Sequence, residues 1–122
     1  YGFITQTFAL DNDPLDVLIF NHDPIDRGSL VRCRVLGVLD FVDDDEIDYK
    51  IIAVPYWTPK ARYPRLSSLE PEHLKIYKQF FRIYKIDRAN TVKVGEWKNG
   101  KKASTVVLDA HNRWQERQVI ND

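Results

Sequence analysis

LVRCRVLGVLDF, residues 30–41, carries the clearest two-residue alternation in the chain. Arg32 and Arg34 occupy one set of alternate positions, and Cys33 and its apolar neighbours occupy the other, which is the period of a half-buried β-strand. Gly37 interrupts the run and predicts a bulge or bend of the kind that β-barrels use. The stretch therefore predicts a bent, half-buried strand.

Three further segments are predicted to be strands. DVLIF at residues 16–20 is a short buried strand, and residues 47–54 form another candidate. Val92, Val94 and Trp97 lie on a further predicted strand, which runs into Asn99–Gly100, a dipeptide typical of a turn. The prolines that follow residue 54 predict an irregular connection.

Two segments have the spacing of helices. Apolar residues from Leu74 to Tyr84 form one stripe, and Pro71 suits the first turn of that helix. Apolar residues from Ala103 to Trp114 are spaced in the same way. Together with the strands, these helices predict an α+β fold: a small, mostly antiparallel barrel flanked by two helices. A chain of 122 residues has room for one such domain.

The composition excludes several classes of protein. The chain is 43% apolar and 12% aromatic, which is enough for one hydrophobic core and excludes a disordered chain. It contains no run of about 20 apolar residues, so we expect no membrane partner. Cys33 is the single cysteine, which excludes an intramolecular disulfide and a cysteine-based zinc site and fits a reducing compartment.

Charge is divided between the two parts of the chain. Residues 1–50 hold eleven acidic and four basic residues, whereas residues 51–122 hold seven and fourteen. The 18 acidic and 18 basic residues cancel, so the chain lacks the net basic balance of a nucleic-acid binder. The division is compatible with two faces that meet at one site, but solvated surface charge is the plainer interpretation.

Two acidic segments carry the candidate chemistry, DNDPLD at Asp11–Asp16 and DDDEIDYK at Asp43–Lys50. Pro14 favours an extended Asp13, and a strand-like backbone would direct Asp11 and Asp13 to the same side. Clustered carboxylates repel one another, so a shared site requires cations, and oxygen donors select Mg²⁺, Mn²⁺ or Ca²⁺. Each segment alone also fits an ordinary turn or hairpin tip. The spacing does not match an EF-hand loop.

DNDPLD closely resembles the DGDPxD signature of the soluble family I inorganic pyrophosphatases, with Asn12 in place of the usual glycine. Asparagine tolerates a left-handed backbone better than most residues, so the turn is expected to survive. Three further motifs agree with the family in the same order: YGFI at residues 1–4, D-x4-D-x-K-x2-AVP at residues 43–55, and FFxxYK at residues 80–85 followed by VKVxxW. The resemblance extends from Tyr1 to about Trp114.

This resemblance implies a closed, OB-like antiparallel barrel with two flanking helices. It also implies hydrolysis of pyrophosphate to two orthophosphates with several Mg²⁺ ions, with Mn²⁺ as a substitute and Ca²⁺ as an inhibitor. The family is cytoplasmic or organellar and forms homo-oligomers. Its members carry further site residues and strands upstream of YGFI, so residues 1–122 are expected to be a single pyrophosphatase-like domain lacking those strands. We do not expect this chain alone to be active.

The resemblance also assigns roles to single residues. It implies metal ligation by Asp11, Asp16, Asp43 and Asp48, deprotonation of the attacking water by Asp13, phosphate binding by Lys50, Tyr84 and Lys85, and support of the Asp16 ligand by Tyr1. Spacing alone leaves Tyr84 open as a core tyrosine, and Lys85 as a charge favoured at a helix C-terminus.

Two other functions compete with the enzyme. A non-catalytic module that binds divalent metal or phosphate would keep the acidic cluster but would need neither a base nor phosphate ligands. Nucleic-acid binding through an OB-like barrel would need a basic, aromatic platform, which Arg32 and Arg34 do not provide. We therefore expect pyrophosphate as the partner and no nucleic acid.

Overall fold

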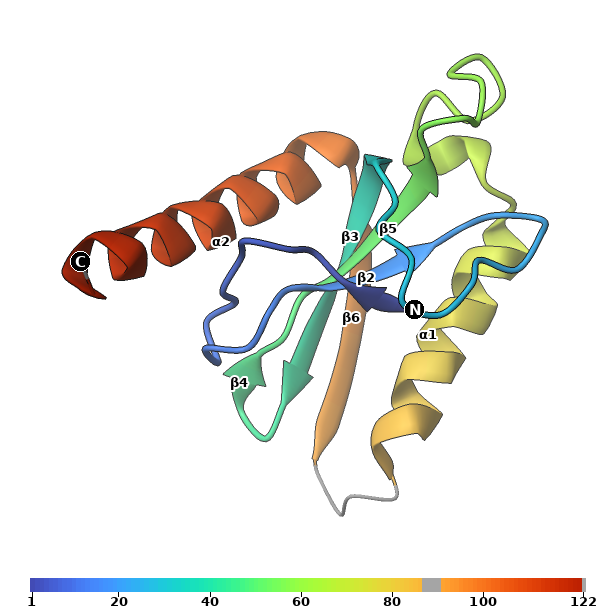
Figure 1. Ribbon diagram of the computed structural model, residues 1–122. Coiled ribbons are helices and arrows are strands. Elements are labelled where there is room, and N and C mark those ends of the chain that lie inside the picture. The colour runs from blue at the N-terminus through green and yellow to red at the C-terminus, as the bar shows by residue number, and fades with distance from the viewer. Residues whose placement is uncertain (87–90, 122) are drawn as a thin grey trace.

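The computed structural model describes residues 1–86 and 91–121, without the side chains of residues 84–86 and 120–121. Its elements along the chain are β1 (Gly2–Phe3), β2 (Asp16–Ile19), β3 (Cys33–Asp43), β4 (Glu46–Ile47), β5 (Lys50–Pro55), the 3₁₀ turn η1 (Leu66–Ser68), α1 (Pro71–Ile86), β6 (Val92–Lys98) and α2 (Gly100–Asn121) (Figure 1). In the described ranges, neither helix is long and apolar enough to cross a membrane.

The strands form one mixed sheet with the order β1-β2-β5-β3-β4, and β6 pairs with β3 beyond this path. Strands β2 and β5 are parallel, whereas the other pairs are antiparallel. The predicted α+β class with two helices is confirmed. The predicted closed barrel is not, because over residues 1–86 and 91–121 the sheet is open. A barrel requires its first and last strands to pair, and β1 pairs with β2 alone.

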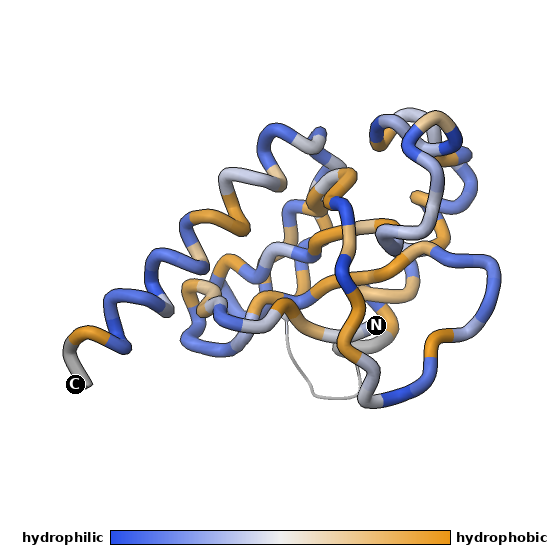
Figure 2. Tube along the Cα trace, turned by 45° about the horizontal axis from the view of Figure 1, so that its top comes forward, coloured by the Kyte–Doolittle hydropathy of each residue, from blue (hydrophilic) through white to orange (hydrophobic). Residues whose placement is uncertain are grey.

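The two helices cover opposite faces of the sheet. Consecutive residues of a strand point to opposite faces, so Ile51 and Ile52 of β5 belong to different clusters. Ile51 belongs to the cluster that contains Ala103, Val106 and Ala110 of α2. Ile52 belongs to the cluster against which Leu74 of α1 packs, and Phe81 of α1 packs with Phe41. The hydropathy colours show apolar central strands and a largely hydrophilic outer end of α2 (Figure 2).

Three element boundaries differ from the prediction. Strand β3 begins at Cys33 rather than Leu30, and the predicted strand 47–54 is divided into β4 and β5. The predicted Asn99–Gly100 turn is wrong, because Gly100 is the first residue of α2. Asn99 caps this helix, since its Oδ1 accepts a hydrogen bond of 3.1 Å from the Lys102 amide.

The bulge predicted at Gly37 is confirmed by a register shift between Val35 and Gly37. A Cβ atom at Gly37 would lie 2.7 Å from the Lys98 carbonyl oxygen and 2.9 Å from a Leu66 methyl group. We expect Gly37→Ala to lower the free energy of unfolding by about 1–3 kcal/mol in urea denaturation, as overpacking does. Gly2→Ala is the matched control, because a Cβ there meets nothing within 4 Å. Equal stability of the two variants would contradict the steric explanation.

Candidate active site

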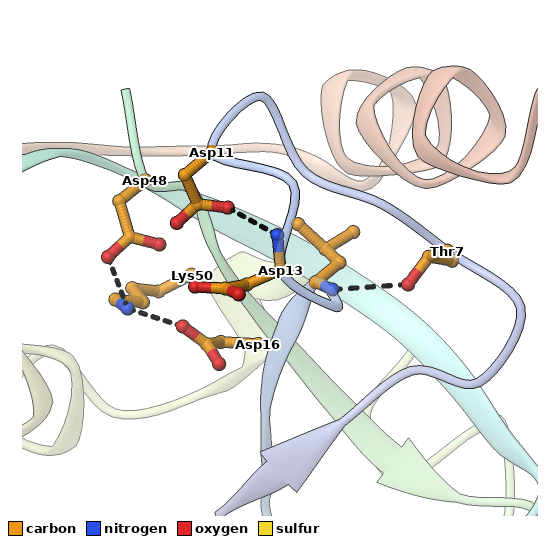
Figure 3. Close-up of polar contacts among 7 residues, drawn as sticks. Thr7, Asp11, Asp13, Asp16, Asp48 and Lys50 are labelled. Carbon is orange, nitrogen blue, oxygen red and sulfur yellow. Dashed lines mark hydrogen bonds and ion pairs between the residues drawn. The ribbon is translucent and has the colours of Figure 1, made fainter. Parts of the chain in front are cut away.

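A buried lysine lies between two aspartates where β2 and β5 run in parallel. The register places Asp16 opposite Lys50, and the Lys50 Nζ lies 2.6 Å from Asp16 Oδ2 and 2.8 Å from Asp48 Oδ2 (Figure 3). The Lys50 side chain is only 1% exposed, compared with 29% for Asp16 and 9% for Asp48. A buried charge is tolerated when it is paired and hydrogen-bonded, so the three residues depend on one another.

Aromatic rings enclose the ammonium group of Lys50. Its Nζ lies 5.1 Å from the centre of the Phe41 ring and 5.7 Å from that of Phe81, within the range of cation–π attraction. Burial alone lowers the pKa of Lys50, but the carboxylates of Asp48 and Asp16 outweigh it, so the pKa lies above its ordinary value. Lys50 therefore stays charged throughout the neutral range.

Tyr1 lies beside this group. Its side chain is 52% exposed, and its ring lies 6.0 Å from Phe80 and 5.8 Å from Phe81. Partial burial raises the pKa of the Tyr1 phenol; the Lys50 charge opposes this effect, and the Asp16 carboxylate adds to it. Asp16 and Lys50 are thus both near enough to act on the Tyr1 hydroxyl. The Tyr1 hydroxyl is therefore neutral, and it lies at the edge of the ion-paired group.

The segment with Asp11 and Asp13 is a turn, so the predicted strand-like geometry is wrong. Asn12 has a φ of +70°, which reverses the backbone between the two aspartates. Asp11 Oδ1 accepts a 3.0 Å hydrogen bond from the Asp13 amide, as in an Asx-turn. The carboxylate of Asp13 points from this turn toward the ammonium of Lys50 (Figure 3).

Thr7 holds the ends of this loop, and no sequence motif indicated it. Its hydroxyl donates a 2.6 Å hydrogen bond to the Ile4 carbonyl and accepts a 3.1 Å bond from the Leu15 amide. The residue is 3% exposed, so its polar atom is satisfied in the interior. Thr7 thus fixes where the loop leaves and rejoins the sheet.

The other predicted residues lie on two further elements. Asp43 is the last residue of β3, opposite Glu46 of β4 and Val92 of β6. Tyr84 and Lys85 lie in the last turn of α1, and their side chains are outside the described part. Among the described side chains, no three or more of His, Cys, Asp and Glu are grouped closely enough to hold a metal ion. The structure brings Asp16, Asp48 and Lys50 together but does not gather the four predicted ligands.

Comparison with known proteins shows the family to which this chain belongs. The family model described as inorganic pyrophosphatase matches residues 1–115. An inorganic pyrophosphatase of Neisseria meningitidis serogroup B is 38% identical over 96% of this chain and 68% of its own length. One from Campylobacter jejuni is 40% identical over 90% of this chain and 66% of its own length. This chain therefore spans about two thirds of the length of these relatives.

Solved structures agree with this result. The crystal structure of an inorganic pyrophosphatase from Neisseria gonorrhoeae matches with a TM-score of 0.83 at 37% identity, over 93% of this chain and 67% of that one. The resemblance recognised in the sequence motifs is confirmed by both kinds of comparison. The chain belongs to the inorganic pyrophosphatase family, whose members are hydrolases of inorganic pyrophosphate that use divalent metal ions.

Proposed function

We propose that the protein containing this chain hydrolyses inorganic pyrophosphate to two orthophosphates and uses Mg²⁺ to do so. The Asp16–Lys50–Asp48 group beside the Asp11–Asp13 turn carries this proposal. The donor set supports Mg²⁺, because Asp11, Asp16, Asp43 and Asp48 offer only hard carboxylate oxygens. These residues are the proposed metal ligands.

Mg²⁺ bound at these carboxylates would lower the pKa of water and neutralise charge on the phosphates. Asp13 is the proposed base that accepts the proton of the attacking water. Its place in the Asx-turn supports this role, because the turn fixes its backbone through the bond from its amide to Asp11. A fixed backbone limits the positions that the Asp13 carboxylate can take, which favours a water bound beside it.

The remaining proposed residues bind phosphate or hold the carboxylates. Lys50 keeps its charge, so it serves both as a phosphate ligand and as the cation that holds Asp16 and Asp48 in place. The resemblance of residues 80–85 to the family motif supports Tyr84 and Lys85 as phosphate ligands. The neutral phenol of Tyr1 is suited to support Asp16 without adding charge.

The wider organisation follows from the same proposal. We propose that residues 1–122 belong to a single pyrophosphatase domain whose remaining strands close the open sheet; the greater length of the relatives supports a larger domain. Exposed Ile76, Phe80 and Ile83 on α1 support homo-oligomer formation. The single thiol of Cys33 supports a reducing, cytoplasmic location.

Release of orthophosphate from pyrophosphate by the intact protein tests the function. We expect turnover with Mg²⁺, turnover with Mn²⁺ as a substitute, inhibition by Ca²⁺, and loss of activity when the metal is removed with a chelator. Binding of Mg²⁺ and phosphate without any turnover would instead favour the non-catalytic module. The same assay on residues 1–122 alone is expected to give no turnover.

A further inference from the structure

The second half of α2 is docked on the loop that carries the Asp11–Asp13 turn, and Figure 1 shows the two segments side by side. The Phe8 amide donates a 3.0 Å hydrogen bond to the Ala110 carbonyl, and Arg113 Nε donates a 2.8 Å bond to the Phe8 carbonyl. His111 Nδ1 lies 2.8 Å from the Gln6 carbonyl oxygen. These contacts fix the loop before it reaches the turn.

One side chain of α2 reaches the turn itself. Arg117 Nη2 donates a hydrogen bond to Asn12 Oδ1, and the Arg117 guanidinium lies 4.3 Å from the centre of the Phe8 ring. The planar guanidinium stacks and donates at the same time, which a lysine ammonium does less well. Among the described hydrogen bonds and ion pairs, no other residue of α2 contacts the side chains of residues 11–13.

Asn12, which Arg117 holds, is the residue of the turn whose backbone conformation most needs a stabilising contact. Asn12 adopts a left-handed backbone, which is less favourable for asparagine than for glycine. Its neighbours on either side are a proposed metal ligand, Asp11, and the proposed base, Asp13. A change in the backbone at Asn12 would move both carboxylates, because the Asx-turn joins them.

We propose that Arg117 is a positioning residue, which keeps Asp11 and Asp13 in their binding geometry by holding Asn12. A glycine at this position would adopt the turn unaided and would offer no side chain to hold. The Asn12 side chain offers Arg117 a hydrogen-bond acceptor, and this contact offsets the unfavourable left-handed backbone of Asn12. The catalytic consequence rests on the proposed function, whereas the effect on the loop does not.

Hydrogen exchange of the metal-free, intact protein tests the effect on the loop. We expect Arg117→Ala to speed amide exchange of residues 6–14 by about threefold to tenfold, because one charge-assisted contact is lost. Arg117→Lys should restore part of the protection. Lys101→Ala is the control: it removes a positive charge from the exposed first turn of α2, about 24 Å along the helix, and should leave the loop unchanged.

Metal titration tests the effect on the site. For Arg117→Ala, we expect the Mg²⁺ concentration that gives half-maximal pyrophosphate hydrolysis to rise about threefold to tenfold. The kcat at saturating Mg²⁺ should change less than this, because Mg²⁺ binding itself selects the ordered turn. Unchanged loop exchange and an unchanged Mg²⁺ requirement would overturn the proposal. A wild-type protein without pyrophosphatase activity would refute the proposed function and leave the exchange experiment valid.

Asn12→Gly provides a second test, and Arg117→Lys takes the place of Arg117→Ala in it if the alanine variant does not fold. In a double-mutant cycle, Arg117→Ala should have a smaller effect on exchange of residues 6–14 once Asn12 is glycine, because the acceptor is gone and only the contact with the Phe8 ring remains. Non-additivity of this kind supports direct coupling of the two side chains. Fully additive effects would show that Arg117 acts elsewhere and would overturn the proposal.

Discussion

Lys50→Met is expected to lower the free energy of unfolding by about 3 kcal/mol. Removing one partner of a buried ion pair costs about 3–5 kcal/mol, because the remaining charge is left without compensation. The lower value applies here because Asp16 is 29% exposed and keeps part of its hydration. The Asp48 side chain is only 9% exposed and does not keep its hydration. Methionine retains most of the side-chain volume against Phe41, so the lower free energy of unfolding is due to the missing charge and not to a cavity.

Urea denaturation of the two proteins side by side measures this loss. Lys78→Met is the matched control, because Lys78 pairs with Glu96 at 3.2 Å on the surface, and Glu96 is 79% exposed. Exposed pairs contribute about 0–1 kcal/mol, so the control should remain close to the wild type. Similar losses in the two variants would mean that Lys50 does not compensate the charges of Asp16 and Asp48.

The local parts of the fold could be predicted from the sequence. The sequence LVRCRVLGVLDF correctly predicted a strand with a bulge at Gly37, because both depend on neighbouring residues. The predicted half-buried alternation was wrong in its centre, since Leu36 to Leu39 are buried on both faces of the sheet. The Asn99–Gly100 dipeptide misled the prediction, since Asn is favoured both in turns and at helix N-caps. Closure of the barrel is a property of strand pairing, which local patterns do not specify.

The site, like the fold, has features that the sequence indicated and features that it did not. The motifs indicated Asp16, Asp48 and Lys50 as functional. The ion pair of Lys50 with Asp48 is local, whereas its pair with Asp16 depends on the parallel register of β2 and β5, which joins residues 34 positions apart. The Arg117 contact to Asn12 spans 105 positions. No spacing rule indicates a contact of that range, and Arg117 resembles any charged residue on a surface helix.

Asp13→Asn is expected to lower kcat for pyrophosphate hydrolysis by about 10²–10⁴-fold in the intact protein, which is the usual contribution of a general base. The amide cannot accept the proton of the attacking water at neutral pH. The fold of the turn should persist, because its hydrogen bonds use the backbone of Asp13: the amide binds Asp11, and the carbonyl accepts a 2.8 Å bond from the Ala9 amide.

Steady-state phosphate release with Mg²⁺, together with Mg²⁺ binding measured by calorimetry, separates the base from a ligand. Asp45→Asn is the control, since it removes the same carboxylate from the exposed β3–β4 turn, where the φ of +66° suits asparagine equally well. That variant should keep wild-type turnover. Turnover of Asp13→Asn close to the wild type would remove Asp13 as the base, whereas loss of Mg²⁺ binding along with turnover would make it a metal ligand. Retained Mg²⁺ binding with lost turnover is the result expected if Asp13 accepts the proton and does not bind the metal.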